Sequence, residues 1–158
     1  MLKSIYYALV YPHLLYGILS WGSASESIMK KVRGVQNRII KIMKFLPFGS
    51  CDLKPIYEEL KILQVDDIYR LELGKFMYKF NNDLLPENFQ EYFKYVRSIH
   101  HHNTRMSSNL CMYPIKTNTK FSKSTLKYKG VEIWNSIPLK VKTLPSIKSF
   151  SNKLKTFF

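Results

Sequence analysis

The sequence predicts a mainly α protein: a small helical bundle, followed by an irregular basic C-terminal segment that ends in a short helix. Apolar residues recur at helical spacing through much of residues 2–96, most clearly in 26–45. From about residue 97 the chain becomes rich in Ser, Thr, Asn and Lys. An amphipathic pattern returns at 147–157. We therefore expect two domains, 1–96 and 97–158.

Length and charge narrow the function. With 158 residues and 46% hydrophobic content, the chain is long enough to bury a core, so wholesale disorder is not expected. The net charge of +14 favours a polyanion partner. It divides into +1 over residues 1–25, +5 over 26–46, −4 over 47–92 and +12 over 93–158. Two cysteines cannot form a disulfide framework, and they fit a reducing compartment, nucleus or cytoplasm.

Residues 2–21 predict a buried helix that bends at Pro12 and stops near Gly22. The charge-free stretch from Ser4 to Ser25 leaves a second interpretation, a signal peptide or membrane span. Four tyrosines, Pro12 and His13 are unfavourable in a hydrocarbon core. We therefore expect no membrane contact.

Residues 26–45 predict an amphipathic helix that Ser25 caps and that Glu26 stabilises at its positive end. Its expected apolar face consists of Ile28, Val32, Val35, Ile39, Ile42 and Met43. Its opposite face carries the bases Lys30, Lys31, Arg33, Arg38, Lys41 and Lys44, with no acid expected to oppose them. Such a face is either a solvated surface or a ridge that follows phosphates.

The next helices are predicted at 53–61, with Pro55 in the first turn, and at 65–82, where the aromatic stripe belongs to the core. Asn88 is expected to cap a further helix at 89–96. Residues 97–125 are expected to be loop, and residues 126–136 regain aromatic side chains. The last helix places four apolar residues on one side: Ile147, Phe150, Leu154 and Phe157.

Enzyme motifs are missing. The sequence has no P-loop, no dinucleotide-binding glycine fingerprint and no nucleophile elbow. Asp66 and Asp67 begin a helix, where acids favour the dipole rather than a metal. The consecutive histidines 100–102 lack zinc-ligand spacing and are better explained as a basic loop next to Arg105. We expect no catalytic residue, no metal, no cofactor and no small-molecule substrate.

The basic tail interleaves its charges with aromatic rings. Bases that meet backbone phosphates, together with rings that stack on nucleobases, are typical of single-strand or hybrid binding. The alternative is that the rings form a small core under a lysine-rich surface, and Trp134 fits that alternative as a buried anchor. The candidate nucleic-acid-binding residues are Lys30, Lys31, Arg33, Arg38, Lys41, Lys44, Arg105, Lys127 and Lys129.

Several phrases resemble, in order, the region after the palm in reverse transcriptases of jockey-like non-LTR (LINE-type) retrotransposons. They are Tyr11–Gly17 with Trp21-Gly22, Val35–Ile40, Leu73–Phe80, Leu84–Phe89, His102–Arg105 and Tyr128–Pro138. The motif residues are Tyr16, Gly17, Trp21, Gly22, Gln36, Asn37, Asn103, Thr104, Gly130, Trp134, Asn135 and Pro138. Each phrase is weak alone, and together they cover almost the whole chain.

The resemblance implies a location as well as a family. Residues 1–96 would be thumb-like, and the chain would be the thumb and C-terminal part of an RNA-directed DNA polymerase. The family's catalytic Ala-Asp-Asp motif and cysteine–histidine knuckle are absent from this sequence. The expected partners are RNA, DNA or an RNA–DNA hybrid, and an upstream palm domain of the same polyprotein. The alternative is a structural remnant that self-associates or packs on a palm.

Overall fold

The computed structural model describes residues 2–47, 49, 52–99 and 109–157. Within these ranges the regular elements are helices, joined by a single antiparallel bridge between Tyr95 and Met112, which confirms the mainly α class. The backbone groups into two compact units, Met1–Tyr69 and Arg70–Phe158, which we call the first and second units. The sequence had suggested a division between residues 96 and 97, which falls inside the second unit.

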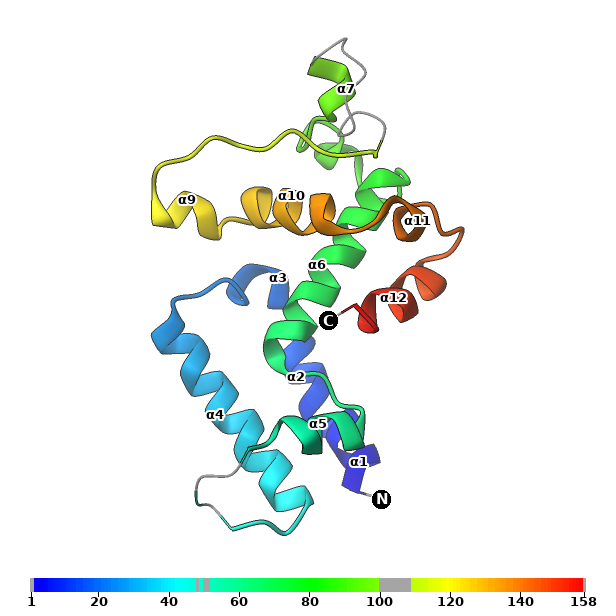
Figure 1. Cartoon of the computed structure of the whole chain (residues 1–158). Helices are drawn as coiled ribbons and strands as arrows, with labels where there is room; N and C mark the ends of the chain where they lie inside the picture. Colours follow the sequence, from blue (N-terminus) through cyan, green and yellow to red (C-terminus); the bar gives the residue numbers. More distant parts are fainter. Residues whose placement is uncertain (1, 48, 50–51, 100–108, 158) are drawn as a thin grey trace. The chain divides into compact units, whose positions relative to one another are not determined.

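The first unit begins with four short helical pieces rather than one helix. They are α1 (Leu2–Ile5), the π-helical turn η1 (Tyr6–Val10), α2 (Tyr11–Leu15) and α3 (Ile18–Trp21) (Figure 1). The π turn ends two residues before Pro12, whose ring would clash with the carbonyl four residues earlier in an α-helix. In the π turn, the Tyr11 N–H donates to the carbonyl of Tyr6 instead. Gly17, at φ +62°, separates α2 from α3.

Helix α4 (Glu26–Met43) forms where the sequence predicts it, but it buries a different face. Met29, Gln36 and Ile40 are buried, whereas Ile28, Val35 and Ile42 of the predicted apolar face are exposed. The buried face is rotated by roughly a quarter turn from the predicted one. Ser25 occupies the N-cap position of α4, as predicted, but its Oγ lies 3.0 Å from Ser27 Oγ and makes no cap hydrogen bond within the described part of α4.

Helices α5 (Lys54–Leu60) and α6 (Val65–Asn81) confirm two further predictions. Pro55 lies in the first turn of α5, as expected. A hydrophobic cluster in the first unit joins η1, α4 and α5 with the residues on either side of α5. Its buried members are Tyr6, Ile40, Leu53, Tyr57 and Ile62. Gly22 packs so closely that an added Cβ would lie 2.4 Å from a carbon of the Tyr69 ring.

The second unit contains α6 from Arg70 onward, and it has more helix than the sequence predicts. Its further elements are the 3-10 turn η2 (Glu87–Phe89), α7 (Val96–Ile99), α9 (Lys120–Ser124), α10 (Leu126–Ser136), α11 (Leu139–Lys142) and α12 (Ile147–Lys155). The helix predicted at 89–96 is wrong, because Asn88 lies inside η2 and Tyr95 pairs with Met112. Thr119 and Thr125 cap α9 and α10 through their side chains.

Packing in the second unit centres on the part of α6 that begins at Arg70. The Tyr78 ring lies 4.6 Å from the Phe150 ring of α12, and the Tyr78 hydroxyl donates to the carbonyl of Leu144 at 2.6 Å. On α12, Phe150 and Leu154 are fully buried as predicted, but Phe157 is exposed. The aromatic stripe of α6 therefore belongs to the core, as the sequence indicates.

The residues that the structure describes include no helix with the length and apolar character needed to cross a membrane.

Candidate nucleic-acid interface

Arg33 on α4 is held by two carboxylates of the first unit. Its guanidinium donates to Asp66 from Nε at 2.6 Å and from Nη2 at 2.9 Å, and it also pairs with Glu26. Hydrogen bonds to Asp66 and then to Glu26 raise the pKa of Arg33, and the Arg33 hydrogen bond lowers the pKa of Glu26. The expectation that no acid opposes the basic face is therefore wrong at Arg33, which cross-links α4 to α6.

Two other predicted bases also have internal partners. Lys44 pairs with Glu59 of α5 at 2.5 Å, and the Lys41 ammonium donates to the carbonyl of Gly49 at 2.5 Å. Both side chains are half-buried. Lys41 and Lys44 thus help to position the end of α4, and they have less freedom to meet a ligand.

The other three predicted bases of α4 form an exposed set that we call the basic ridge: Lys30, Lys31 and Arg38. None of them forms an ion pair with a carboxylate of the described residues. Lys31 and Arg38 are seven residues apart, so they lie on the same side of α4, about 10 Å apart along its axis. The ridge therefore presents three cations that a polyanion can reach.

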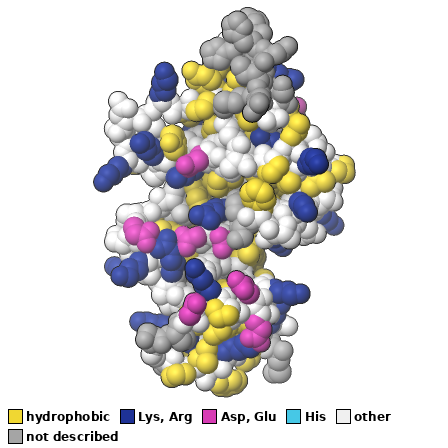
Figure 2. Space-filling view, in the orientation of Figure 1, with side chains coloured by type: hydrophobic (Ala, Val, Ile, Leu, Met, Phe, Trp, Pro, Cys, Tyr) yellow, Lys and Arg dark blue, Asp and Glu magenta, His cyan; other side chains and the backbone are white. Residues whose placement is uncertain are grey.

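On the face shown in Figure 2, acidic side chains gather over the part where the first unit is drawn in Figure 1, whereas Lys and Arg side chains are spread over both units. This distribution agrees with the ion pairs of Arg33 and Lys44. The number of bases on α4 alone therefore overstates the positive surface of the first unit.

The motif residues next to the ridge hold the fold. Gln36 is 2% exposed, donates from Nε2 to the Tyr6 hydroxyl and the Leu63 carbonyl, both at 2.9 Å, and accepts from the Val65 N–H at 2.9 Å. Asn37 accepts a hydrogen bond from the Tyr57 hydroxyl at 2.8 Å. Both amides therefore connect α4 to the rest of the first unit rather than facing a ligand.

The first motif phrase is also structural. Trp21 donates from its indole nitrogen to the carbonyl of Tyr16 at 2.8 Å, which closes the turn around Gly17. The Tyr16 side chain itself is strongly exposed. Gly22 packs beneath Tyr69.

In the second unit, the two predicted lysines of α10 differ from each other. Lys129 is half-buried and pairs with Glu132 at 2.7 Å. Lys127 is exposed, and its ammonium lies 5.2 Å from the centre of the Tyr92 ring. It borders an apolar cavity of about 150 Å³ that Tyr92, Tyr113 and Val131 also line. Lys127 is thus the more accessible of the two.

Sequence reasoning missed one exposed combination in the tail. Phe121 on α9 is 81% exposed and lies between the exposed Lys120 and Lys123. Phe121 is one of the aromatic rings of the basic tail, but the candidate nucleic-acid-binding residues include neither lysine. Trp134 and Phe150 are fully buried, so the small-core interpretation is right for them.

The second-unit motif residues are structural too. Asn135 brackets Met112, because its Oδ1 accepts from the Met112 N–H and its Nδ2 donates to the Met112 carbonyl, both at 2.8 Å. Trp134 donates to the Leu110 carbonyl at 2.9 Å. A Cβ at Gly130 would lie 2.7 Å from the sulfur of Met77, and Pro138 precedes the first turn of α11.

Lys142 is a base that the fold has buried. It is 1% exposed, donates to the carbonyl of Asn109 at 3.1 Å and lies 5.2 Å from the Trp134 ring centre. Its ammonium is also 3.9 Å from the sulfur of Cys111. Burial lowers the pKa of Lys142. It therefore contributes nothing to the accessible positive surface.

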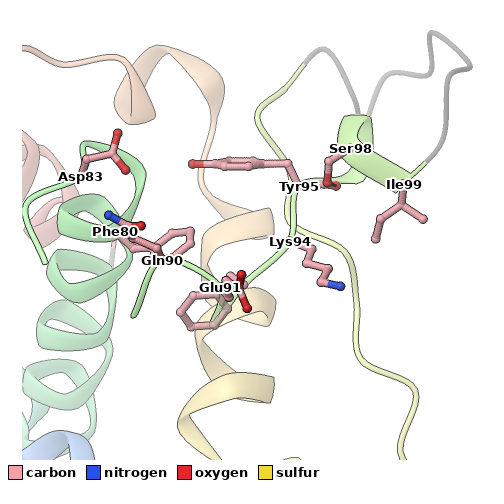
Figure 3. A pocket seen from close by; sticks show the side chains of 9 residues that line it. Phe80, Asp83, Gln90, Glu91, Lys94, Tyr95, Ser98 and Ile99 are labelled. Carbon is pink, nitrogen blue, oxygen red and sulfur yellow. Dashed lines mark hydrogen bonds between the residues drawn. The ribbon is translucent and has the colours of Figure 1, made fainter. Parts of the chain in front are cut away.

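A pocket of about 500 Å³ lies in the second unit between the end of α6 and α7 (Figure 3). Figure 3 shows Lys94 and Ile99 on the side opposite Asp83, with Glu91 between them. Two carboxylates against one ammonium make the pocket unfavourable for phosphate. None of the predicted nucleic-acid-binding residues lines it.

Asn103, Thr104, Arg105, Cys51 and the histidines 100–102 lie outside the described residues. Within the described ranges, no group of three or more His, Cys, Asp or Glu side chains could hold a metal.

Comparisons of the chain with models of protein families, with curated proteins and with solved structures found no match. The resemblance to reverse transcriptases therefore stays a prediction from the sequence phrases, and the site is described by its own geometry.

Proposed function

We propose that the chain is a non-catalytic nucleic-acid-binding region related to the thumb and downstream part of a non-LTR retrotransposon reverse transcriptase. Its task would be to hold a primer–template or template strand through backbone phosphates. The catalytic steps would belong to a palm domain of the same polyprotein.

The basic ridge is the observation that carries this proposal. Lys30, Lys31 and Arg38 are exposed on one helix, whereas Arg33 and Lys44 are neutralised by carboxylates. Contacts from lysine and arginine to phosphates fix position without reading sequence. In the second unit, Lys127 and the Lys120–Lys123 pair around Phe121 could add phosphate and stacking contacts.

The experiment is fluorescence anisotropy with a labelled RNA–DNA primer–template, at about 50 to 300 mM salt. Each phosphate contact contributes about 0.9 to the slope of log K against log salt concentration. Replacing the whole ridge with Lys30→Gln, Lys31→Gln and Arg38→Gln should reduce that slope by about 3 units.

A matched control removes the same charge elsewhere. Lys148, Lys153 and Lys155 are exposed on α12, and their triple replacement by Gln lowers the net charge equally. The control should change the slope by less than about 1 unit. No binding by a folded chain at the lowest salt, or equal effects of the two triples, would contradict a specific role of the ridge.

A second candidate function is a structural chain that self-associates or packs on a palm. It is favoured by strongly exposed apolar side chains near the N-terminus, notably Leu9 and Tyr16. In the following helix α3, Ile18 is buried and Trp21 is half-buried, so neither adds much to this surface. A concentration-dependent increase of molar mass in light scattering, lost in Leu9→Gln, would support this candidate.

A further inference from the structure

Helix α4 has a second apolar face that its own unit leaves uncovered. Ile28, Val35 and Ile42 are 53%, 56% and 59% exposed and recur every seven residues. We call them the aliphatic stripe. A row with this spacing runs along one side of a helix, and from Ile28 to Ile42 it extends about 21 Å. Isolated exposed aliphatic residues are ordinary, but an aligned row of three is a candidate contact surface.

The spacing resembles the seam of a coiled coil. Half-buried Val32 and Ile39 lie between the members of the stripe, so that apolar residues follow at steps of four and three. Ile39 also packs against the core cluster of the first unit, so only the outer part of its side chain adds to this row. This alternation is the pattern that allows one helix to pack along another, knobs into holes. The inner face, with Met29, Gln36 and Ile40, is already occupied by the first unit. The outer face is therefore suited to a helix supplied by another molecule.

The charges beside the aliphatic stripe indicate which kind of partner helix would bind to it. Lys31 and Arg38 are exposed on the side of the stripe that faces away from the unit's core. In coiled coils the residues that flank the seam select partners by opposite charge. A second copy of the chain would bring two net charges of +14 together, which opposes association. An acidic flank on the partner would instead be attracted to both cations.

We propose that the aliphatic stripe of α4 binds an amphipathic helix of a partner protein, one with a four–three apolar seam and acidic residues that face Lys31 and Arg38. A membrane surface suits the stripe less well, because interfacial helices bury a wide apolar face, and half of the apolar arc of α4 already lies in the core. The proposal is independent of nucleic-acid binding, although both ligands would meet Lys31 and Arg38.

The test uses synthetic helical peptides of about three heptads with an Ile/Leu seam. One has glutamate flanks, one has lysine flanks, and one is a scrambled version of the acidic peptide with the same composition. Binding of each labelled peptide to the full chain is measured by anisotropy. We expect saturable binding of the acidic seam peptide, and at least tenfold weaker binding of the scrambled and lysine peptides.

Three variants locate the contact. Ile28→Gln/Val35→Gln/Ile42→Gln should weaken the acidic peptide at least tenfold with an unchanged circular dichroism spectrum, because all three side chains are exposed. Leu2→Gln/Ile5→Gln/Leu9→Gln is the matched control on another exposed apolar surface, and it should bind as the unmodified chain does. Lys31→Glu/Arg38→Glu should reverse the preference toward the lysine peptide.

Three results would overturn the proposal: no binding of the acidic peptide, equal binding to the stripe variant, or equal binding of the scrambled peptide. A dimer in sedimentation equilibrium that the stripe variant abolishes would assign the stripe to a second copy. Binding to anionic vesicles that the stripe variant loses would assign it to a membrane. The stripe variant should still bind the primer–template, so failure here is distinguishable from failure of the proposed function.

Discussion

Gln36 donates a hydrogen bond to the hydroxyl of Tyr6 at 2.9 Å, and both residues are almost completely buried in the first unit. The same side chain also bonds the carbonyl of Leu63 and the N–H of Val65. One amide thus connects η1, α4 and the start of α6. Few other side chains can both donate and accept hydrogen bonds as the Gln36 amide does, so this position should tolerate few substitutions.

Gln36→Leu should lower the free energy of unfolding by about 3 kcal/mol, because it removes the partner of three polar groups, two of them buried and one partly buried. Urea unfolding followed by circular dichroism measures the loss. Arg38→Leu, two positions away and exposed, serves as the control and should stay within about 0.5 kcal/mol. Equal stability of both variants would show that the Gln36 network contributes little.

The two arginines of α4 should separate stability from binding. Arg33→Gln removes the contacts with Asp66 and Glu26 and should cost about 1 kcal/mol of stability, because these pairs are partly exposed. Arg38→Gln should leave stability unchanged and lower the salt slope of primer–template binding by about 1 unit. Thermal unfolding and anisotropy on both proteins check the pair. A loss of stability in Arg38→Gln, or a lower salt slope in a stable Arg33→Gln protein, would contradict a structural role for Arg33 and a ligand-facing role for Arg38.

Two glycines should respond to alanine with opposite signs. Gly22→Ala would bring a Cβ to 2.6 Å from the backbone oxygen of Ile18 and into the Tyr69 ring, at a cost of about 2 kcal/mol. At Gly34, inside α4, an added Cβ would meet no atom of the described residues within 4 Å. Gly34→Ala should therefore stabilise the chain by roughly 0.5–1 kcal/mol. Urea midpoints of the two variants test both signs, and a destabilised Gly34→Ala would indicate a contact on that face of α4.

Lys142 should make stability rise with pH on the alkaline side. Burial lowers its pKa in the folded state, while in the unfolded chain the pKa stays near about 10.4. Between these two values the unfolded chain binds more protons, so the free energy of unfolding increases with pH. Lys142→Met should flatten this rise, which urea unfolding at several pH values from about 7 up to 10 would reveal.

The control for Lys142 is Lys140→Met on the same helix, where the side chain is exposed. In the Lys140→Met protein the free energy of unfolding should still increase with pH. Measurements stay below about pH 10, because burial raises the pKa of Tyr6 and Tyr95 and stability falls once unfolded tyrosines ionise. If the free energy of unfolding of Lys142→Met increased with pH as much as that of the unmodified chain, Lys142 would be excluded as the cause of the increase.

The sequence predicted those helices whose buried face consists of regularly spaced apolar residues. Helices α5 and α6, and the buried Phe150 and Leu154 of α12, follow directly from apolar spacing. The burial of α4 did not follow, because a polar residue, Gln36, lies on the inner face while the aliphatic Val35 faces outward. Periodicity ranks residues by hydrophobicity and cannot recognise a buried amide whose partners come from distant segments.

The candidate interface was predictable only in part. The basic face of α4 is visible in the sequence, but the carboxylates that occupy Arg33 and Lys44 come from α6 and α5. Their proximity depends on tertiary packing. Helix α10 was missed although Thr125 caps it. Its β-branched and aromatic residues have modest helix propensity, and packing of Gly130 and Trp134 in the second unit compensates for this.

The π turn before Pro12 has a consequence for how this segment can change in evolution. A π turn holds one residue more than an α turn, and Ala8 and Leu9 within it are exposed. Their side chains can therefore vary widely. Deleting either residue would return the segment to α-helical spacing. The Pro12 ring would then clash with the carbonyl four residues before it, and the Tyr6 side chain would turn away from Gln36. Selection should thus preserve the number of residues between Tyr6 and Pro12 more strictly than their identity.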